Sequence, residues 1–273
     1  MKNFIILLGL FKLLRHAKIS GFVMVIVLFL AGFFLSDGFW QKEKKTNPSV
    51  DVSVNDLPHP PKSFSQTKKV LYEQVYKNHK KTFYCQCKFN KNKKVYLSTC
   101  GVKPRSNVKR AKRIEAEHVF PAHQFGQHRA CWREKQCTNS KGKKFKGRRC
   151  CEESDPVFKI AHNDLHNLYP SVGEINGDRS NYRWGMISGE KRAYGKCDIE
   201  VDSSIRRAEP PESVRGNIAR TYFYMEQTYK LNISDSQRQM FKAWDKKDPV
   251  DAWERERNQR IQKIQGNLNP FIQ

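Results

Sequence analysis

Two short polar clusters hold the residue types that could perform chemistry. In the first, Glu117 stands directly before His118, and Pro121 follows three positions later. A carboxylate beside an imidazole can supply a ligand for a hard metal ion and a general base at one place. Because such pairs are also common on protein surfaces, this cluster indicates catalysis only if other residues join it.

The second cluster extends from residue 164 to residue 181 and holds His166, Asn167 and Asn176 among other polar groups. Asn and Asp side chains near Pro and Gly often bond their own backbone in turns. Taken alone, the composition therefore favours a loop slightly over a functional site.

Three histidines, His118, His123 and His128, recur every five residues and raise the alternative of a zinc site. Residues on one helical face are three or four positions apart, so this spacing places the histidines on no common face. The His-Glu-x-x-His pattern of zinc hydrolases is also absent from the sequence. A zinc-dependent hydrolase is therefore the weaker interpretation.

Regular elements must bring the two clusters together. Residues 113–120 are predicted to form a short strand that ends at Pro121. On a regular strand Glu117 and His118 would face opposite sides, so both can reach one site only if the strand ends or bulges there.

The remaining sequence predicts a mixed α+β domain with a helical C-terminal third. Residues 83–96 have the pattern of a strand, and the charged, glycine-containing residues 131–159 are predicted to form a long loop. Apolar residues at helical spacing predict helices over residues 63–80, 213–230, 236–246 and 250–264.

The eight cysteines favour disulfides over a zinc site. Zinc ligands are usually separated by about two to four residues, whereas adjacent and Cys-x-Cys spacings strain a shared tetrahedral metal. Eight cysteines can form four disulfides in roughly 105 ways, which the sequence does not separate. The candidates are Cys85, Cys87, Cys100, Cys131, Cys137, Cys150, Cys151 and Cys197.

The N-terminus predicts export. Residues 1–18 are basic and contain no acid, and residues 19–35 follow without a charge. This order predicts a signal peptide or an uncleaved signal anchor within residues 1–40. The proline-containing residues 41–62 are predicted to be a linker, and residues 63–273 the folded domain. We expect a periplasmic or secreted protein, with an inner-membrane anchor in the N-terminal segment as the alternative and no other membrane contact.

The charge balance indicates an anionic partner. The 51 Lys and Arg residues against 27 Asp and Glu residues give a formal net charge of +24, and only five charged residues precede residue 41. With 38% hydrophobic residues the chain can bury a core, which argues against a disordered basic tail. The basic charge therefore belongs to the part of the chain that is predicted to be exported, and not to the N-terminal segment.

Both clusters, together with three later segments, closely resemble the bacterial endonuclease I family of periplasmic or secreted nucleases. The first matching segments are EAEHVFPAHQFG at residues 115–126 and DLHNLYPSVGEINGDRSN at residues 164–181. RGNIARTYFYM, AWDKKDPVDAWE and RIQKIQGNLNPF follow in the same order as in the family. The resemblance extends from about residue 70 to the C-terminus.

The resemblance implies an α+β fold with the ββα-metal, or His-Me finger, nuclease core, extended by additional helices and bridged by disulfides. It implies a Mg²⁺-dependent, non-specific endonuclease that hydrolyses the phosphodiester bonds of DNA, and RNA as well, to leave 5′-phosphates. One Mg²⁺ is expected in each active site, with Ca²⁺ or Mn²⁺ as other occupants, and the protein is expected to be a monomer.

Residue by residue, the resemblance assigns His118 as the general base and Glu117 with Asn176 as the ligands of the metal ion. Both proposed ligands offer oxygen atoms, which Mg²⁺ prefers, and leave positions for water and phosphate. Arg148 matches the family's arginine that holds the product phosphate. Arg149 is the alternative, because an insertion next to it makes the register ambiguous.

Two departures from the family are visible. An insertion of about ten residues lies within residues 133–146 and is strongly basic, and two C-terminal cysteines of the family are missing. Cys137 and Cys150 are extra in return, which suggests that they pair with each other. Basic runs are usually solvated surface, but this one leads into the phosphate arginine and is predicted to bind nucleic acid through Lys141, Lys143, Lys144 and Lys146.

The competing interpretation is a catalytically silent exported protein that binds or takes up DNA. Such a protein would keep the charge but could dispense with Glu117, His118 and Asn176, all of which are present. His166 and Asn167 are expected to brace the site rather than to react.

Overall fold

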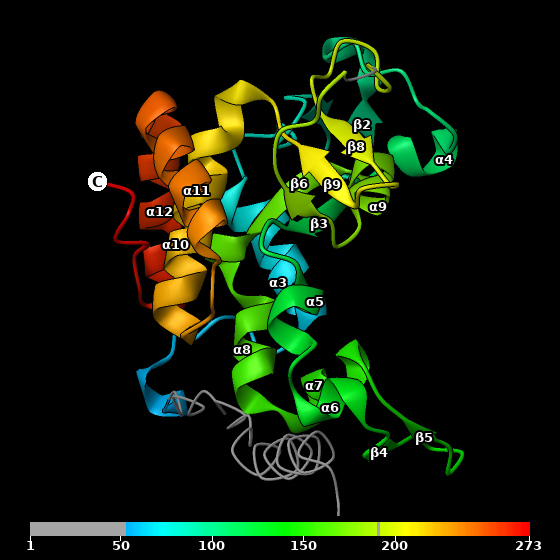
Figure 1. Ribbon diagram of the computed structural model, residues 1–273, viewed down its shortest axis with the longest axis vertical. Helices are drawn as coiled ribbons and strands as arrows, with labels where there is room; N and C mark the ends of the chain where they lie inside the picture. Colours follow the sequence, from blue (N-terminus) through cyan, green and yellow to red (C-terminus); the bar gives the residue numbers. More distant parts are fainter. Residues whose placement is uncertain (1–52, 190–191) are drawn as a thin grey trace, which may run out of the picture. The chain divides into compact units, whose positions relative to one another are not determined.

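The computed structural model describes residues 53–189 and 192–273 and shows a domain of helices and short strands (Figure 1). The helices are α3 (Phe64–Val70), α4 (Val108–Ala111), α5 (Ala122–Gly126), α6 (Ala130–Arg133), α7 (Arg148–Ser154), α8 (Pro156–Asn163), α9 (Gly173–Arg179), α10 (Arg215–Tyr229), α11 (Asp235–Lys247) and α12 (Ala252–Gln265). The strands are β1 (Lys88–Phe89), β2 (Val95–Tyr96), β3 (Ile114–His118), β4 (Cys137–Thr138), β5 (Lys144–Phe145), β6 (Leu168–Val172), β7 (Arg183–Trp184), β8 (Glu200–Asp202) and β9 (Arg207–Glu209).

The predicted N-terminal export segment, residues 1–40, lies outside the described residues, as does most of the predicted linker. Within the described part, no helix is both long enough and apolar enough to cross a membrane. The last residues of the predicted linker pack on the domain: Leu57 is buried, and the His59 backbone N–H donates to the Gln265 carbonyl at 3.0 Å. The packed chain therefore begins before residue 63.

Two antiparallel strands followed by a helix form the middle of the domain (Figure 1). Strand β3 pairs with β6, so that Glu117 stands opposite Tyr169 and His118 opposite Leu168. Helix α9 begins at Gly173, directly after the last residue of β6. This order joins the two polar clusters of the sequence into one structural unit.

The C-terminal helices α10, α11 and α12 are confirmed and pack beside this unit (Figure 1). The buried Arg220 of α10 donates to Glu254 of α12 and, at 2.6 Å, to Asp245 of α11. Asp251 caps α12, and Gly266 ends it in the left-handed conformation at φ 87°, which favours glycine. A buried arginine that is bonded to two carboxylates holds the three helices in one arrangement.

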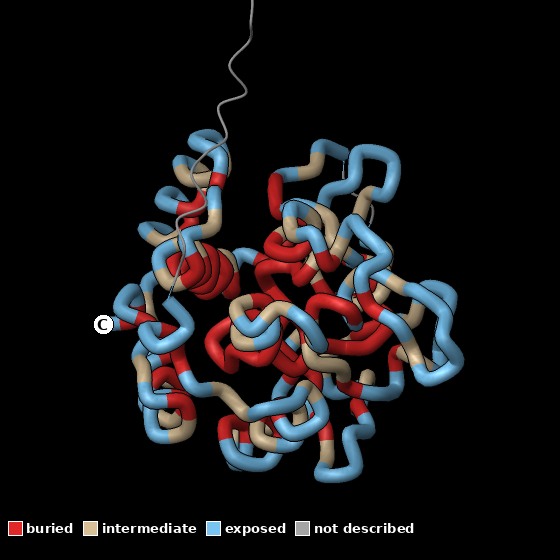
Figure 2. The backbone as a smooth tube through the Cα atoms, turned by 90° about the horizontal axis from the view of Figure 1, so that it is seen from below, coloured by how far each residue is buried: buried red, intermediate tan, exposed pale blue. Residues whose placement is uncertain are grey.

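The buried segments meet in the interior, and the exposed loops surround them (Figure 2). The second polar cluster belongs to this interior, so the prediction of a loop there is wrong. The segment forms a 3₁₀ helix at Leu165–Asn167, strand β6 and helix α9. Asp164 explains the difference, because its carboxylate accepts the hydroxyls of Tyr224 and Tyr229, each at 2.6 Å. The other carboxylate oxygen of Asp164 makes the local bond that the composition suggested, to the His166 N–H at 2.8 Å, so the distant donors add to it.

The predicted long loop over residues 131–159 is also wrong, since the segment contains α6, β4, β5, α7 and α8. One local signal was overlooked: Asp155 caps α8 through the backbone N–H of Phe158 at 2.9 Å, and Pro156 occupies the first turn. The strand pattern at residues 83–96 yields only the short hairpin β1–β2.

All eight cysteines form disulfides, which confirms the disulfide interpretation over cysteine-bound zinc. Cys137 pairs with Cys150, as the insertion suggested. The pairs are Cys85–Cys197, Cys87–Cys100, Cys131–Cys151 and Cys137–Cys150.

We expect the exported domain to contain close to zero titratable thiols when it is denatured without reductant. Reduction should lower stability, because each native disulfide lost typically costs about 2–5 kcal/mol. The check is thiol titration before and after reduction, combined with thermal unfolding of both forms. Eight reactive thiols and bound zinc in the unreduced protein would contradict the pairing.

Candidate active site

A cavity of about 770 Å³ brings the two polar clusters together. Four residues assigned from the sequence line it: Glu117 and His118 at the end of β3, Asn176 on α9, and Arg148 at the start of α7. His123 also lines the cavity, whereas the exposed His128 does not. Within residues 53–189 and 192–273, no group of three or more His, Cys, Asp or Glu side chains could hold a metal ion.

Strand β3 ends at His118, which allows neighbouring side chains to share one cavity. The next residue, Val119, donates its N–H to the Asn167 carbonyl at 3.1 Å. Its own carbonyl accepts bonds from Arg179 at 2.6 Å and from the Trp184 indole at 3.1 Å. The first of these bonds continues the pairing of β3 with β6 by one residue, and the other two hold the Val119 carbonyl at the end of the strand. Glu117 and His118 both line the cavity at this end. The Asn167 side chain also bonds both backbone groups of Phe120, at 2.7 and 2.9 Å, which fits a bracing role.

Glu117 is buried but keeps one oxygen free within the described structure. Its Oε1 accepts the Tyr84 hydroxyl at 2.8 Å and lies 3.0 Å from Arg179 Nη1. No described residue bonds Oε2. Burial raises the pKa of Glu117 above its usual value, although Arg179 and Tyr84 act in the opposite direction.

The His118 ring is held in one orientation. Its Nε2 lies 2.8 Å from the backbone carbonyl of His162, which can only accept a hydrogen bond, so Nε2 carries the proton. The unprotonated nitrogen is then Nδ1, which no described residue bonds. Phe64 stacks on the ring at 5.4 Å. Burial, followed by the charge of Arg148, lowers the pKa of His118 to about 3, so the imidazole is neutral at pH 7.

Asn176 is oriented by a second acid that the sequence argument did not single out. Its Nδ2 donates to Glu115 Oε2 at 2.9 Å, which leaves Oδ1 without a partner among the described residues. Glu115 also accepts from Arg110 at 2.7 Å and from Arg113 at 2.8 Å. Burial alone would raise the pKa of Glu115, but these hydrogen bonds outweigh it and lower the pKa.

The cavity is lined by more positive than negative side chains. Glu115 and Glu117 are its two acids. Six basic side chains line it as well: Lys68, Lys93, Arg110, Arg113, Arg148 and Arg179. Such a lining suits a polyanion whose charge is spread along a backbone.

The donors fit a hard divalent cation. Glu117 Oε2 and Asn176 Oδ1 are oxygens of the kind that Mg²⁺ prefers, and each is left free by partners that bond the other atom of its group. Two protein oxygens leave the remaining coordination positions to water and substrate, which is the usual arrangement for Mg²⁺.

The other candidates lie outside the cavity. Arg149 is exposed and pairs with Glu153 at 2.9 Å, so of the two candidate arginines only Arg148 lines the cavity. Lys141, Lys143, Lys144 and Lys146 are exposed on the segment that contains β4 and β5. His166 is buried against the C-terminal segment, with Nε2 at 3.1 Å from the Asn267 carbonyl.

Three residues of the site escaped the sequence argument. Glu115 is two positions from Glu117, so strand alternation places both on one face and could have indicated it. Arg179 and Tyr84 carried no comparable signal, because one is an arginine in a basic chain and the other is distant in sequence from both clusters.

Known sequences provide an independent comparison. The model of the Endonuclease I family matches residues 63–273. An extracellular deoxyribonuclease of Aeromonas hydrophila is 43% identical over 221 residues, which are 80% of this chain and 92% of the relative. A periplasmic deoxyribonuclease of the same organism is 45% identical over 204 residues, 73% of this chain and 81% of the relative. Endonuclease-1 of Buchnera aphidicola subsp. Acyrthosiphon pisum (strain APS) is 45% identical over 207 residues, 75% and 78% of the two chains.

The mixed domain with four disulfides and these relatives define the class: the protein is an exported endonuclease, periplasmic or secreted. The chain belongs to the endonuclease I family, which confirms the resemblance of its motifs.

Proposed function

We propose that the protein is a Mg²⁺-dependent, non-specific endonuclease that hydrolyses DNA, and RNA too, to leave 5′-phosphates. In this proposal β3, β6 and α9 are the ββα-metal core. The observation that carries the proposal is the single cavity in which Glu117, His118, Asn176 and Arg148 meet. The named relatives support DNA as the substrate, since two of them are deoxyribonucleases.

His118 acts as the general base. Its neutral ring offers the Nδ1 lone pair to a water in the cavity, while the bond from Nε2 to the His162 carbonyl keeps the ring from rotating. When the ring takes a proton, the same carbonyl accepts from a charged donor, which stabilises the protonated form.

Glu117 and Asn176 would hold the metal ion through Oε2 and Oδ1. A Mg²⁺ ion there would supply charge neutralisation at the phosphoryl group and at the leaving oxygen. Arg179 and Tyr84 fix the Glu117 carboxylate, and Glu115 fixes the Asn176 amide, so both oxygens are oriented before substrate binds.

Arg148 binds the phosphate group, because it lines the same cavity and has a planar, permanently charged guanidinium. The cavity lysines, Lys68 and Lys93, offer contacts to the sugar-phosphate backbone rather than to base edges. Contacts of this kind position nucleic acid without reading its sequence, which supports non-specific cleavage.

Plasmid degradation in a series of chelator and metal concentrations tests this function. We expect cleavage with Mg²⁺, loss of cleavage in excess chelator and recovery on adding Mg²⁺. A protein that binds DNA but never cleaves it, with any divalent cation, would instead be the silent binding protein. Cleavage restored by zinc alone would indicate a zinc hydrolase.

Glu115→Gln should raise the Mg²⁺ concentration needed for half-maximal cleavage by about 10-fold, because loss of an outer-shell partner typically costs 10–100-fold in metal affinity. The introduced amide can donate as well as accept, so it no longer fixes which atom of Asn176 faces the metal. Mn²⁺ binding followed by electron paramagnetic resonance gives a readout that does not depend on turnover.

Glu153→Gln is the matched control for this substitution, since Glu153 pairs with the exposed Arg149 away from the cavity. Its Mg²⁺ requirement should equal that of the parent protein. An unchanged requirement in Glu115→Gln as well would remove Glu115 from the metal-positioning role.

A further inference from the structure

We propose that residues 133–146 form a basic arm that holds duplex nucleic acid beyond the catalytic cavity. The inference rests on the proposed nuclease function and adds a second binding surface to it. The basic arm consists of β4, β5, the turn between them and the residues that lead in and out.

The basic arm is an ordered hairpin. Strands β4 and β5 are antiparallel, with Cys137 opposite Phe145 and Thr138 opposite Lys144. In the turn, the Asn139 carboxamide oxygen accepts the backbone N–H groups of Lys141 and Lys143 at 2.9 and 3.0 Å. Gly142 has φ +72°, a conformation that favours glycine. A solvated loop without structure would not show this set of bonds.

Both ends of the basic arm leave from the wall of the catalytic cavity. Trp132 stands directly before the arm and Arg148 follows it by two positions, and both side chains line the cavity. The backbone N–H of Gly147 donates to the Cys131 carbonyl at 3.0 Å, which closes the base of the arm. The arm therefore starts where the proposed phosphate arginine lies.

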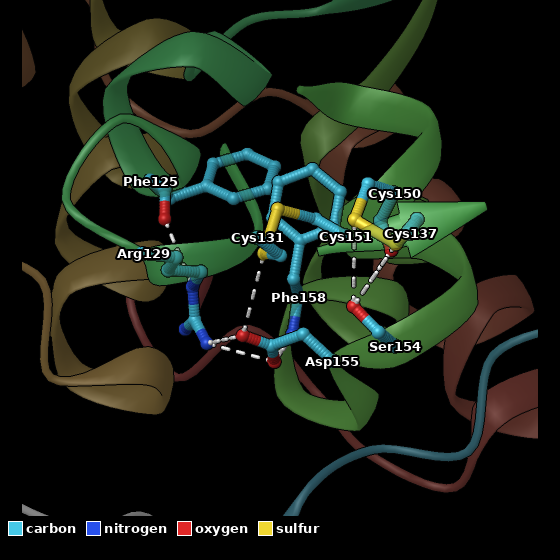
Figure 3. The surroundings of a disulfide bond; sticks show 9 residues. All are labelled: Phe125, Arg129, Cys131, Cys137, Cys150, Cys151, Ser154, Asp155 and Phe158. Carbon is cyan, nitrogen blue, oxygen red and sulfur yellow. Dashed lines mark hydrogen bonds and ion pairs between the residues drawn. A yellow bond between two sulfur atoms is a disulfide. The ribbon is translucent and has the colours of Figure 1, made fainter. Parts of the chain in front are cut away.

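Two disulfides fix the base of the arm. Cys131–Cys151 joins α6 to α7, and Cys137–Cys150 joins β4 to the same helix (Figure 3). Arg129 supports this region through a 2.6 Å ion pair with Asp155 (Figure 3). Crosslinks at the base limit bending of the arm, so its charges keep their position relative to Arg148.

One face of the arm is used for packing, and the other is open. Cys137 bonds to α7, and the Phe145 ring lies 5.3 Å from the Arg149 guanidinium. Thr138 and Lys144 form the next cross-strand pair, and because side chains alternate along a strand they point away from α7. The four lysines are exposed, and no carboxylate of the described residues pairs with them: Lys141, Lys143, Lys144 and Lys146.

The length of the arm indicates which phosphates it can reach. About seven residues on each side, at roughly 3.3 Å each, span up to about 20 Å. That span equals about six base pairs of duplex at roughly 3.4 Å each. A duplex bound at the cavity thus offers phosphates to the turn of the arm, where Lys141 and Lys143 lie, only if it continues well past the cut site.

The test compares two DNA ligands in a His118→Ala background, which separates binding from hydrolysis. One is a stem of about 8 base pairs closed by a loop, and the other a duplex of about 24 base pairs, lengths chosen against the reach of the arm. The arm variant carries Lys141→Gln, Lys143→Gln, Lys144→Gln and Lys146→Gln. The control carries four exposed changes on α11 and α12: Lys242→Gln, Lys246→Gln, Lys247→Gln and Lys263→Gln.

We expect the arm variant to lose affinity for the long duplex and to keep its affinity for the short stem. Each lost phosphate contact lowers the slope of log affinity against log salt by about 0.9, so four contacts lower it by about 3.6. When the salt concentration rises fourfold, the affinity of the arm variant for the long duplex should then fall by a factor roughly 100-fold smaller than the affinity of the parent does. The control should match the parent on both ligands.

Three results would contradict the proposal that the basic arm binds duplex nucleic acid. One is an unaltered salt slope on the long duplex. Another is a loss of affinity that is not specific to the arm: the arm variant loses affinity equally for both ligands, or the control variant loses as much affinity as the arm variant. Either outcome would mean that only the net charge of the protein matters. The third is a loss of binding only to vesicles of anionic lipid, which would assign the arm to a membrane surface. The nuclease proposal fails separately, if the unmodified protein cleaves no DNA with any divalent cation.

Discussion

His118→Ala should reduce DNA cleavage by about 10²–10⁴-fold at saturating Mg²⁺, because loss of a general base typically costs that much. Folding and DNA binding should persist, since the ring contributes one hydrogen bond and Glu117, Asn176 and Arg148 remain. The measurement is the initial rate of duplex cleavage, with affinity and thermal unfolding determined on the same preparation.

Two further observations separate a base from a merely structural residue. Imidazole added to the solution should restore part of the rate, because the vacated position opens into the cavity. His128→Ala, a change of the same type at an exposed position outside the cavity, should cleave like the parent. A near-parental rate in His118→Ala would mean that another group activates the water.

Substitutions of the two proposed metal ligands should give the second large effect. Glu117→Gln is the informative change, because Glu117→Ala would leave the buried Arg179 without its carboxylate and add a folding defect. We expect at least about 100-fold slower cleavage at low Mg²⁺, more than an outer-shell change costs. Raising Mg²⁺ should restore part of the rate.

Added Mg²⁺ should restore the cleavage rate of Asn176→Ala more completely than that of Glu117→Gln. The reason is that Asn176→Ala removes a neutral ligand and leaves the carboxylate in place. Comparison of the two Mg²⁺ titration curves with that of the parent is the measurement. Curves that coincide with the parental curve in both variants would rule out Glu117 and Asn176 as the ligand pair.

The cavity brings together four residues that were assigned from the sequence, but the contacts that hold them could not be predicted from it. The end of β3 near Pro121 follows from local chemistry, since proline stops a strand. At the end of β3 next to Glu117 and His118, Arg179 and Trp184 bond the Val119 carbonyl, contacts made across 60 and 65 positions. Periodicity in a short window carries no information on such contacts.

Contacts between residues that are distant in the sequence also account for the parts of the fold that differ from the prediction. Around Asp164 the polar composition suggested a local turn, and the carboxylate does accept the His166 N–H, but two distant tyrosines also bond it and hold the segment in the core. The C-terminal helices were predictable because their signals are local: helical spacing, the Asp251 cap and the terminating Gly266. In the insertion, charge and glycine concealed a hairpin whose order depends on disulfides that composition does not pair.

The position of the metal ion tests the central proposal most directly. His118→Ala protein can be crystallised with a duplex and Mn²⁺, and anomalous scattering then locates the ion. The account predicts Mn²⁺ bound by Glu117 Oε2 and Asn176 Oδ1, with a phosphate of the duplex beside it and beside Arg148. Mn²⁺ bound elsewhere, with the phosphate far from these residues, would contradict it.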